Sequence, residues 1–235
     1  MEDIGESLAL AFGLVASWDA DLIEIVGLSL QVSVTATAIA CLLGIPLGAA
    51  LAVARFPGRG AVLTILNALM GLPPVVVGLL VYLQLSRAGP LGFLGLLYTP
   101  SAMVIAQTIL ILPIVAALSR TVIEDMSREY AEYFRSLSLT RVQGIGALIF
   151  DARFSLLTVA LAGFGRAIAE VGAVMIVGGN IDHVTRVMTT AIALETSKGE
   201  LALALALGAV LLALALIVNA AVSILSLSAA RYAHA

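Results

Sequence analysis

The chain has 235 residues, of which 61% are hydrophobic and 11% charged, and its mean hydropathy is +1.12. A soluble domain has roughly 25% charged residues, so this chain has too few to cover a water-exposed surface and is predicted to be an integral membrane protein. A net charge of −3 without a basic patch argues against a nucleic-acid partner. One cysteine and two distant histidines exclude an intramolecular disulfide and predict no metal site on this chain.

Five segments reach about 20 apolar residues, the length that an α-helix needs to span a lipid bilayer. They cover residues 25–54, 61–85, 102–123, 154–177 and 201–227. A shorter apolar piece, 8–17, is expected at the membrane interface. The first 54 residues contain no Lys or Arg, which argues against a cleavable signal peptide. The sequence therefore predicts an all-α, polytopic membrane protein that forms a single domain over residues 1–235.

Basic residues in the linkers predict the orientation in the membrane. Three linkers on one side of the five spans carry Arg55, Arg59, Arg120, Arg128, Arg135, Arg141, Arg153 and Arg231, whereas the other side carries Arg87, Arg186 and Lys198. Cytoplasmic loops are enriched in Lys and Arg. We therefore expect the N-terminus outside and the C-terminus in the cytoplasm.

Two linkers are predicted to be structured. Residues 125–150 mix charged, aromatic and aliphatic side chains and are expected to form short helices at the cytoplasmic surface. In the outer linker, the apolar residues Val184, Val187, Met188, Ala191 and Ile192 have the spacing of one helix face. This amphipathic helix is expected to lie along the membrane, where it either anchors the chain or docks an external protein.

The sequence lacks the motifs of the enzymes that act in membranes. Its only lysine, Lys198, precedes Gly199 rather than Ser or Thr, so no phosphate-binding GxxxxGK[ST] loop is present. The two histidines cannot form an HExxH pair. Transport is therefore favoured over catalysis. An ion-coupled secondary transporter remains an alternative, although its one carboxylate within a span, Glu170, has an arginine one turn away.

One cytoplasmic stretch resembles a known motif. "EYFRSLSLTRVQGIGALIFDAR", residues 132–153, is similar to the EAA loop of ABC-importer permeases, which docks on the ATPase subunit. Glu132 matches the glutamate of the motif, whereas Ser138 stands in place of its glycine and Phe150 in place of its proline. The resemblance implies that the ATPase is contacted by Glu132, Arg135, Ser136, Leu137, Ser138 and Leu139.

Three further stretches resemble the tungstate-type branch of these permeases, a relative of the molybdate permeases. They are "GIPLGAALAVARFPGRG" (44–60), "GLPPVVVGLLVYLQLSRAGPLGFLGLLYTPSAMVIAQ" (71–107) and "GRAIAEVGAVMIVGGNI" (165–181). The resemblance implies the type I ABC-importer permease fold, a prokaryotic inner-membrane location, a homodimer, two copies of a separate ATPase that binds ATP and Mg²⁺, and an external oxyanion-binding protein. The substrate is expected to be tungstate, with molybdate or another anion as the alternative.

Two charged residues, Arg166 and Glu170, lie inside the otherwise apolar segment 154–177. Their spacing places them on one helix face, where they can form an ion pair. An arginine at mid-membrane costs about 2.5–3.5 kcal/mol on insertion scales, so it requires an explanation. Either the pair fixes helix packing, or Arg166 faces the translocation path and attracts an anion while Glu170 keeps it from becoming a trap.

Other candidates for the path are Pro73, Pro74 and Thr35. The two prolines interrupt the second predicted span and free backbone carbonyls, which predicts either a gate or a simple kink. Ser33, Thr35 and Thr37 alternate along the first span and cannot all share one helix face. In the stretch after Glu170, Gly172 is expected to allow close helix packing, and Gly178 with Gly179 is expected to end the helix.

Overall fold

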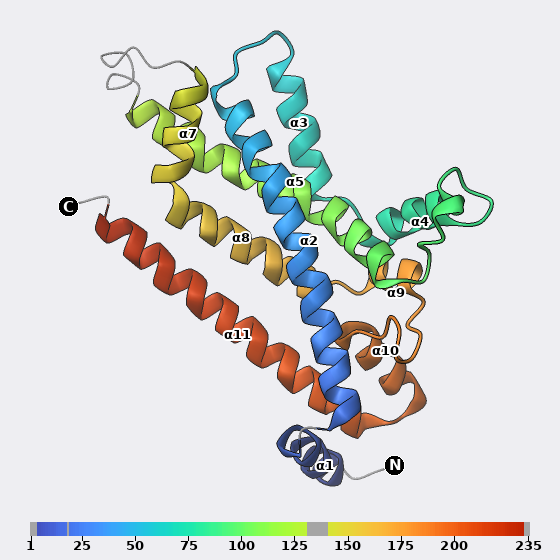
Figure 1. Cartoon of the computed structure of the whole chain (residues 1–235). Coiled ribbons are helices and arrows are strands. Elements are labelled where there is room, and N and C mark those ends of the chain that lie inside the picture. Colours follow the sequence, from blue (N-terminus) through green and yellow to red (C-terminus); the bar gives the residue numbers. More distant parts are fainter. Residues whose placement is uncertain (1–3, 18, 131–140, 233–235) are drawn as a thin grey trace. The chain divides into compact units, whose positions relative to one another are not determined.

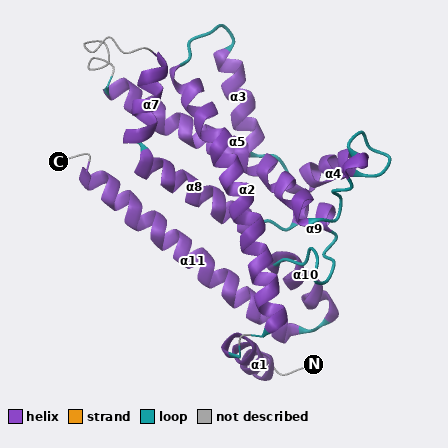
Figure 2. Ribbon diagram, viewed as in Figure 1, coloured by secondary structure: helices purple, strands orange, loops and turns teal. Residues whose placement is uncertain are grey.

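The computed structural model describes residues 4–17, 19–130 and 141–232, and all the regular structure of these residues is helical (Figures 1 and 2). The helices are α1 (Ile4–Ala16), α2 (Ala20–Val53), α3 (Arg59–Met70), α4 (Pro74–Leu85), the 3₁₀ helix η1 (Gly92–Leu94), α5 (Pro100–Glu129), α7 (Arg141–Asp151), α8 (Arg153–Ile168), α9 (Gly172–Gly178), α10 (Met188–Lys198) and α11 (Leu201–Tyr232). The all-α prediction is confirmed. The expected ATPase contacts Glu132, Arg135, Ser136, Leu137, Ser138 and Leu139 lie outside the described residues.

Three helices of the described chain, α2, α5 and α11, are long and apolar enough to cross a membrane, and up to five spans result if each of two bent helix pairs counts as one. The bent pairs are α3 with α4 and α7 with α8. The prediction of about five spans agrees with this range. However, the expected span at 154–177 is not one helix, because α8 ends at Ile168 and a separate helix, α9, follows.

The break in the expected span 61–85 follows from its two prolines. Pro73 is extended, with φ −64° and ψ 122°, and Pro74 is the first residue of α4. Proline has no N–H to donate within a helix and disfavours helical geometry in the residue before it, whereas it suits the first helical position. Each half has only 12 residues, or about 18 Å of helix, less than the thickness of a bilayer core. The prolines therefore separate two half-helices, which is more than a kink.

The chain forms two compact units, and each is assembled from three separate stretches of sequence. Unit 1 comprises Met1–Ala36, Pro73–Gln107 and Gly165–Ile217. Unit 2 comprises Thr37–Leu72, Thr108–Phe164 and Val218–Ala235. Neither unit is a continuous piece of the chain, and the expectation of one domain over residues 1–235 stays a prediction.

Unit 2 contains a tightly packed contact between α2 and α5. A Cβ atom on Gly48 would lie 2.9 Å from the backbone nitrogen of Arg120 and 3.0 Å from Ser119 Cβ, so only glycine fits there. Toward their ends, Ala49 of α2 and Ile123 of α5 join Leu148, Ala152 and Leu156 in a buried apolar cluster. This cluster holds α7 and the start of α8 against the two long helices.

A network of ion pairs lies beside that cluster in unit 2. The carboxylate of Glu124 pairs with Arg59 at 3.5 Å, with Arg128 at 3.0 Å and with Arg120. The Arg59 guanidinium also donates to the carbonyl oxygens of Leu51 and Ala52, which are free because α2 ends at Val53. The network therefore joins the ends of α2 and α5 to the start of α3.

The linker expected at 125–150 differs from the prediction at its start. The long helix α5 continues to Glu129, so residues 125–129 extend that helix rather than forming a short one. α7 does form, and it is bent by 72° from α8. At this bend the Arg153 guanidinium donates to the carbonyl oxygen of Phe150 at 2.9 Å and lies 4.7 Å from the centroid of its ring. Arg153 thus satisfies a helix-end carbonyl where the family motif has a proline.

In unit 1, the two short helices α4 and α9 pack directly on each other (Figure 1). The closest approach is at Gly78, where an added Cβ would lie 2.8 Å from Ala173 Cα and 3.1 Å from the Ala173 carbonyl oxygen. Near the start of both helices, a Cβ on Gly172 would lie 2.8 Å from Val75 Cγ2. The predicted packing role of Gly172 is confirmed. The predicted helix exit is also confirmed, because α9 ends at Gly178 and Gly179 has φ 72°.

The outer amphipathic helix starts later in the chain than expected. It begins at Met188, and Val184 lies in the preceding turn with 46% of its surface exposed. Val187, Met188 and Ala191 are buried within unit 1. These three residues of the expected apolar face therefore contribute to the core of unit 1, and a role of the helix as a membrane anchor or a docking surface stays a prediction.

Candidate functional site

The ion pair expected between Arg166 and Glu170 forms, with 2.6 Å between Arg166 Nη1 and Glu170 Oε2. Only Arg166 lies on α8, however, because that helix ends at Ile168 and Glu170 occupies the break before α9. The Glu170 side chain is 4% exposed and the Arg166 side chain 37% exposed. The carboxylate is thus enclosed by protein, while the Arg166 side chain is partly exposed.

The second oxygen of Glu170 has a backbone partner. Glu170 Oε1 accepts a hydrogen bond from the Ala173 N–H at 3.1 Å, in the first turn of α9. The first N–H groups of a helix have no partner within the helix, and a negative charge at this end is stabilising. Glu170 therefore has two roles, because it neutralises Arg166 and also caps α9. A buried carboxylate without such partners would be strongly destabilising.

Two carbonyl groups at the break accept hydrogen bonds from polar side chains of unit 1. Gln107 Nε2 donates to the Ala167 carbonyl oxygen at 3.1 Å, and Thr189 Oγ1 donates to the Glu170 carbonyl oxygen at 2.7 Å. These two residues come from α5 and α10, and both are buried. Sequence reasoning missed them. Their presence inside apolar stretches could have indicated a structural role, because a polar side chain in such a stretch needs a hydrogen-bond partner.

The structure places the other predicted path residues as follows. Pro74 begins α4, whose second residue, Val75, lies beside Gly172 and hence close to the break that holds Glu170. Pro73 caps the same helix. Thr35 is on an exposed face of α2, whereas Ser33 and Thr37 are buried. The structure therefore brings the prolines near the ion pair but does not bring Thr35 to it.

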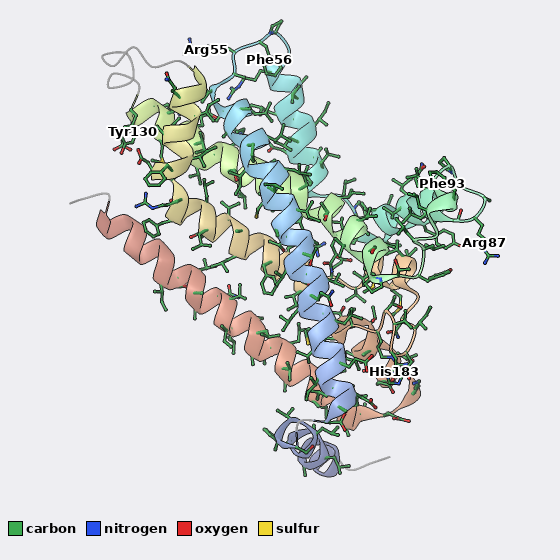
Figure 3. The ribbon with its side chains drawn as sticks, viewed as in Figure 1. Arg55, Phe56, Arg87, Phe93, Tyr130 and His183 are labelled. Atoms are coloured by element: carbon green, nitrogen blue, oxygen red, sulfur yellow. The ribbon has the colours of Figure 1, made fainter. Side chains whose placement is uncertain are left out.

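A second polar cluster in unit 1 surrounds His183, which precedes α10 (Figure 3). His183 Nδ1 lies 3.0 Å from Glu24 Oε2, and the Asp182 carboxylate is 3.9 Å from Nε2. The hydrogen bond with Glu24, followed by the negative charge of Asp182, raises the pKa of His183 above its usual 6.5. The protonated imidazole is therefore the form that these carboxylates favour.

We expect NMR titration of the labelled histidines to give His183 a pKa above 6.5, and the variant Glu24→Gln to lower it. A raised pKa means that the contact stabilises the protein below about pH 6.5 and that this contribution is lost as the pH rises through the raised value. His234 provides the internal comparison. An identical His183 pKa in the parent and in Glu24→Gln would contradict the assignment to Glu24.

The chain matches a family profile and several named permeases. The profile of the family described as "Binding-protein-dependent transport system inner membrane component" matches residues 44–230. The "Tungstate uptake system permease protein TupB" of Peptoclostridium acidaminophilum is 42% identical over 94% of this chain and 97% of its own length. The protein of the same name from Campylobacter jejuni is 43% identical over 66% of this chain and 65% of its own length.

Other relatives carry different names. A "Probable anion ABC transporter permease protein" of Haloferax volcanii is 42% identical over 85% of this chain and 88% of its own length. Permease proteins named for sulfate or molybdenum transport match at 25–30% identity. The family profile and the first relative each cover most of the chain, including α3, α4 and the Arg166–Glu170 ion pair. The chain therefore belongs to the family of binding-protein-dependent transport system inner membrane components.

Proposed function

We propose that this chain is the permease subunit of an ATP-driven importer for an oxyanion, with tungstate as the substrate. The observation that carries the proposal is the 42% identity, over nearly the full length of both chains, to a permease named for tungstate uptake. Relatives named for sulfate or molybdenum transport are less similar, at 25–30% identity. Molybdate or another anion is the alternative, which the anion permease of Haloferax volcanii favours.

The geometry of the ion pair supports an anion path past Arg166. The Arg166 side chain is 37% exposed, so it can meet a solute, yet its guanidinium is bonded to a buried carboxylate. A positive group in a poorly solvated place attracts a dianion strongly. An anion can cross only if each site binds it weakly enough to release it. An arginine paired with a carboxylate therefore suits conduction better than an unpaired arginine. In this proposal, Glu170 lowers the affinity of Arg166 for the anion and holds the guanidinium in place.

The chain supplies the path, and we infer that other subunits supply energy and capture. Members of this family work with a binding protein, as the family description states. We propose a homodimer of this chain with two copies of an ATPase that binds ATP and Mg²⁺. The ATPase would dock on the segment around Glu132 and Arg135, and the binding protein on the opposite side of the membrane. The N-terminus would then be outside and the C-terminus cytoplasmic.

The substrate is tested most directly on the external binding protein that works with this permease. We expect calorimetric titration to give the tightest binding with tungstate, weaker binding with molybdate and the weakest with sulfate. Uptake of the same three anions by the complete importer should follow the same order. Tightest binding and fastest uptake of molybdate or sulfate would contradict the tungstate assignment while leaving import itself in place.

A further inference from the structure

A small buried cavity lies behind Glu170 in unit 1. Its volume is about 10 Å³, and its polar lining consists of Ser29, Ser33, Gln107, Glu170 and Thr189. All five residues are at most 7% exposed. A cavity needs about 10–15 Å³ and several polar partners to hold one water molecule. Size and lining therefore both match a single water molecule.

One polar atom at this cavity lacks a partner. Gln107 Oε1 is buried and has no hydrogen bond to any described residue. The orientation of the amide is determined by its other atom, because Nε2 donates to the Ala167 carbonyl oxygen and an oxygen in its place would face another oxygen. Rotating the Gln107 amide therefore cannot give Oε1 a hydrogen-bond donor. A buried acceptor left without a donor is costly, so a donor from outside the chain is called for.

No neighbouring hydroxyl group donates to Gln107 Oε1, and those of Ser29 and Thr189 use their protons elsewhere. Ser29 Oγ already donates to the Ile25 carbonyl oxygen at 2.6 Å and accepts from the Met188 N–H at 2.8 Å. Thr189 Oγ1 donates to the Glu170 carbonyl oxygen. The Glu170 carboxylate oxygens accept hydrogen bonds from Arg166 and from the Ala173 N–H. Ser29, Thr189 and Glu170 thus offer lone pairs to the cavity, and an occupant that satisfies Gln107 Oε1 must donate a hydrogen bond or carry positive charge.

Charge balance distinguishes these two kinds of occupant. Arg166 already neutralises Glu170, so a cation in the cavity would add an unpaired buried charge. A water molecule adds no charge and has two protons to donate. We propose that this cavity is a binding site for one water molecule, which donates to Gln107 Oε1 and holds the amide that bonds the Ala167 carbonyl. Gln107 is thus a positioning residue for the break that carries the Arg166–Glu170 pair.

A high-resolution structure of the complete importer tests the site directly. We expect one peak in the cavity at about 2.7–3.2 Å from Gln107 Oε1, the range of a hydrogen bond. The peak should persist when sodium salts are replaced by choline salts. An empty cavity at a resolution that shows other buried waters would overturn the proposal. A peak that disappears without sodium would identify a cation and would overturn it as well.

A cavity-filling variant provides an independent test. Val32 also lines the cavity and is 1% exposed, so Val32→Ile places a methyl group where the water would be. If the water is expelled, Gln107 Oε1 loses its donor, and we expect the Tm of the importer to fall by about 2–4 °C. In the Gln107→Met background, which has no such acceptor, the same change should lower Tm by less than about 1 °C.

The double variant separates water loss from simple crowding. Equal decreases in Tm in both backgrounds would mean that isoleucine is too large for the site, and would overturn the proposal. A rise in Tm on Val32→Ile in the parent chain would mean that a dry void has been filled, with the same consequence. Tm is measured without any oxyanion, so these outcomes do not depend on the proposed substrate.

Discussion

Replacing Arg166 by alanine is expected to reduce oxyanion uptake by at least about tenfold, whereas Arg166→Lys should retain a substantial part of it. Alanine removes the positive charge on the proposed path and leaves the buried Glu170 carboxylate unpaired. Breaking a buried ion pair from one side typically costs about 3–5 kcal/mol, so the Tm should fall as well. Lysine keeps the charge but loses the planar guanidinium geometry. Uptake of labelled tungstate into proteoliposomes with the complete importer is the measurement.

A double variant distinguishes a path role from a purely structural one. Arg166→Met with Glu170→Gln removes both charges, while the glutamine can still accept the hydrogen bond from the Ala173 N–H. Neutral replacement of a buried pair is often tolerated, so the Tm should recover. If Arg166 attracts the anion, uptake should stay low in this stable protein. Recovery of both Tm and uptake would contradict the path role and leave the pair a packing element.

Gly78→Ala is expected to reduce oxyanion uptake nearly as much as Arg166→Ala, but by disturbing helix packing. The added Cβ would lie 2.8 Å from Ala173 Cα and 3.1 Å from its carbonyl oxygen, and backbone atoms cannot move aside as a flexible side chain can. α4 and α9 must then separate. Because Ala173 also donates to Glu170 Oε1, the shift reaches the ion pair. We expect a loss of stability of about 1–3 kcal/mol, read as a lower Tm, together with reduced uptake.

Gly27→Ala is the matched control for this prediction. Gly27 is in α2, and a Cβ there would meet no atom within 4 Å. Alanine is more favourable than glycine in a helix by about 0.8–1.0 kcal/mol, so Gly27→Ala should leave Tm unchanged or raise it. If Gly78→Ala were as well tolerated as Gly27→Ala, the close packing of α4 against α9 would not be essential.

The ion pair could be predicted from sequence because its two residues are local. Two opposite charges four positions apart in an apolar segment have few alternatives to pairing. The end of α8 at Ile168 was not predicted, since no proline marks it and Glu170 leaves the helix to cap α9. Apolar content alone does not reveal such a break. In contrast, Pro73 and Pro74 indicate the break between α3 and α4, because proline has no N–H to donate within a helix.

Residues that act through long-range contacts could not be found from the sequence. Gln107 bonds a carbonyl 60 residues away, and Thr189 bonds one 19 residues away. Thr35, Ser33 and Thr37 show the reverse case, because composition made all three candidates and only the fold shows which faces are buried. The apolar periodicity of residues 184–192 correctly indicated a helix, which begins only at Met188, but periodicity does not tell whether an apolar face meets lipid, a partner or the core of the protein itself.

The account depends on this chain being a passive path whose energy comes from a separate ATPase. The most direct test is the accumulation of tungstate against a gradient in proteoliposomes, with the permease alone and with its ATPase and binding protein. We predict accumulation only when both partners and ATP are present, and none in the presence of a non-hydrolysable ATP analogue. Accumulation by the permease alone, abolished by an uncoupler, would contradict the account and identify an ion-coupled secondary transporter.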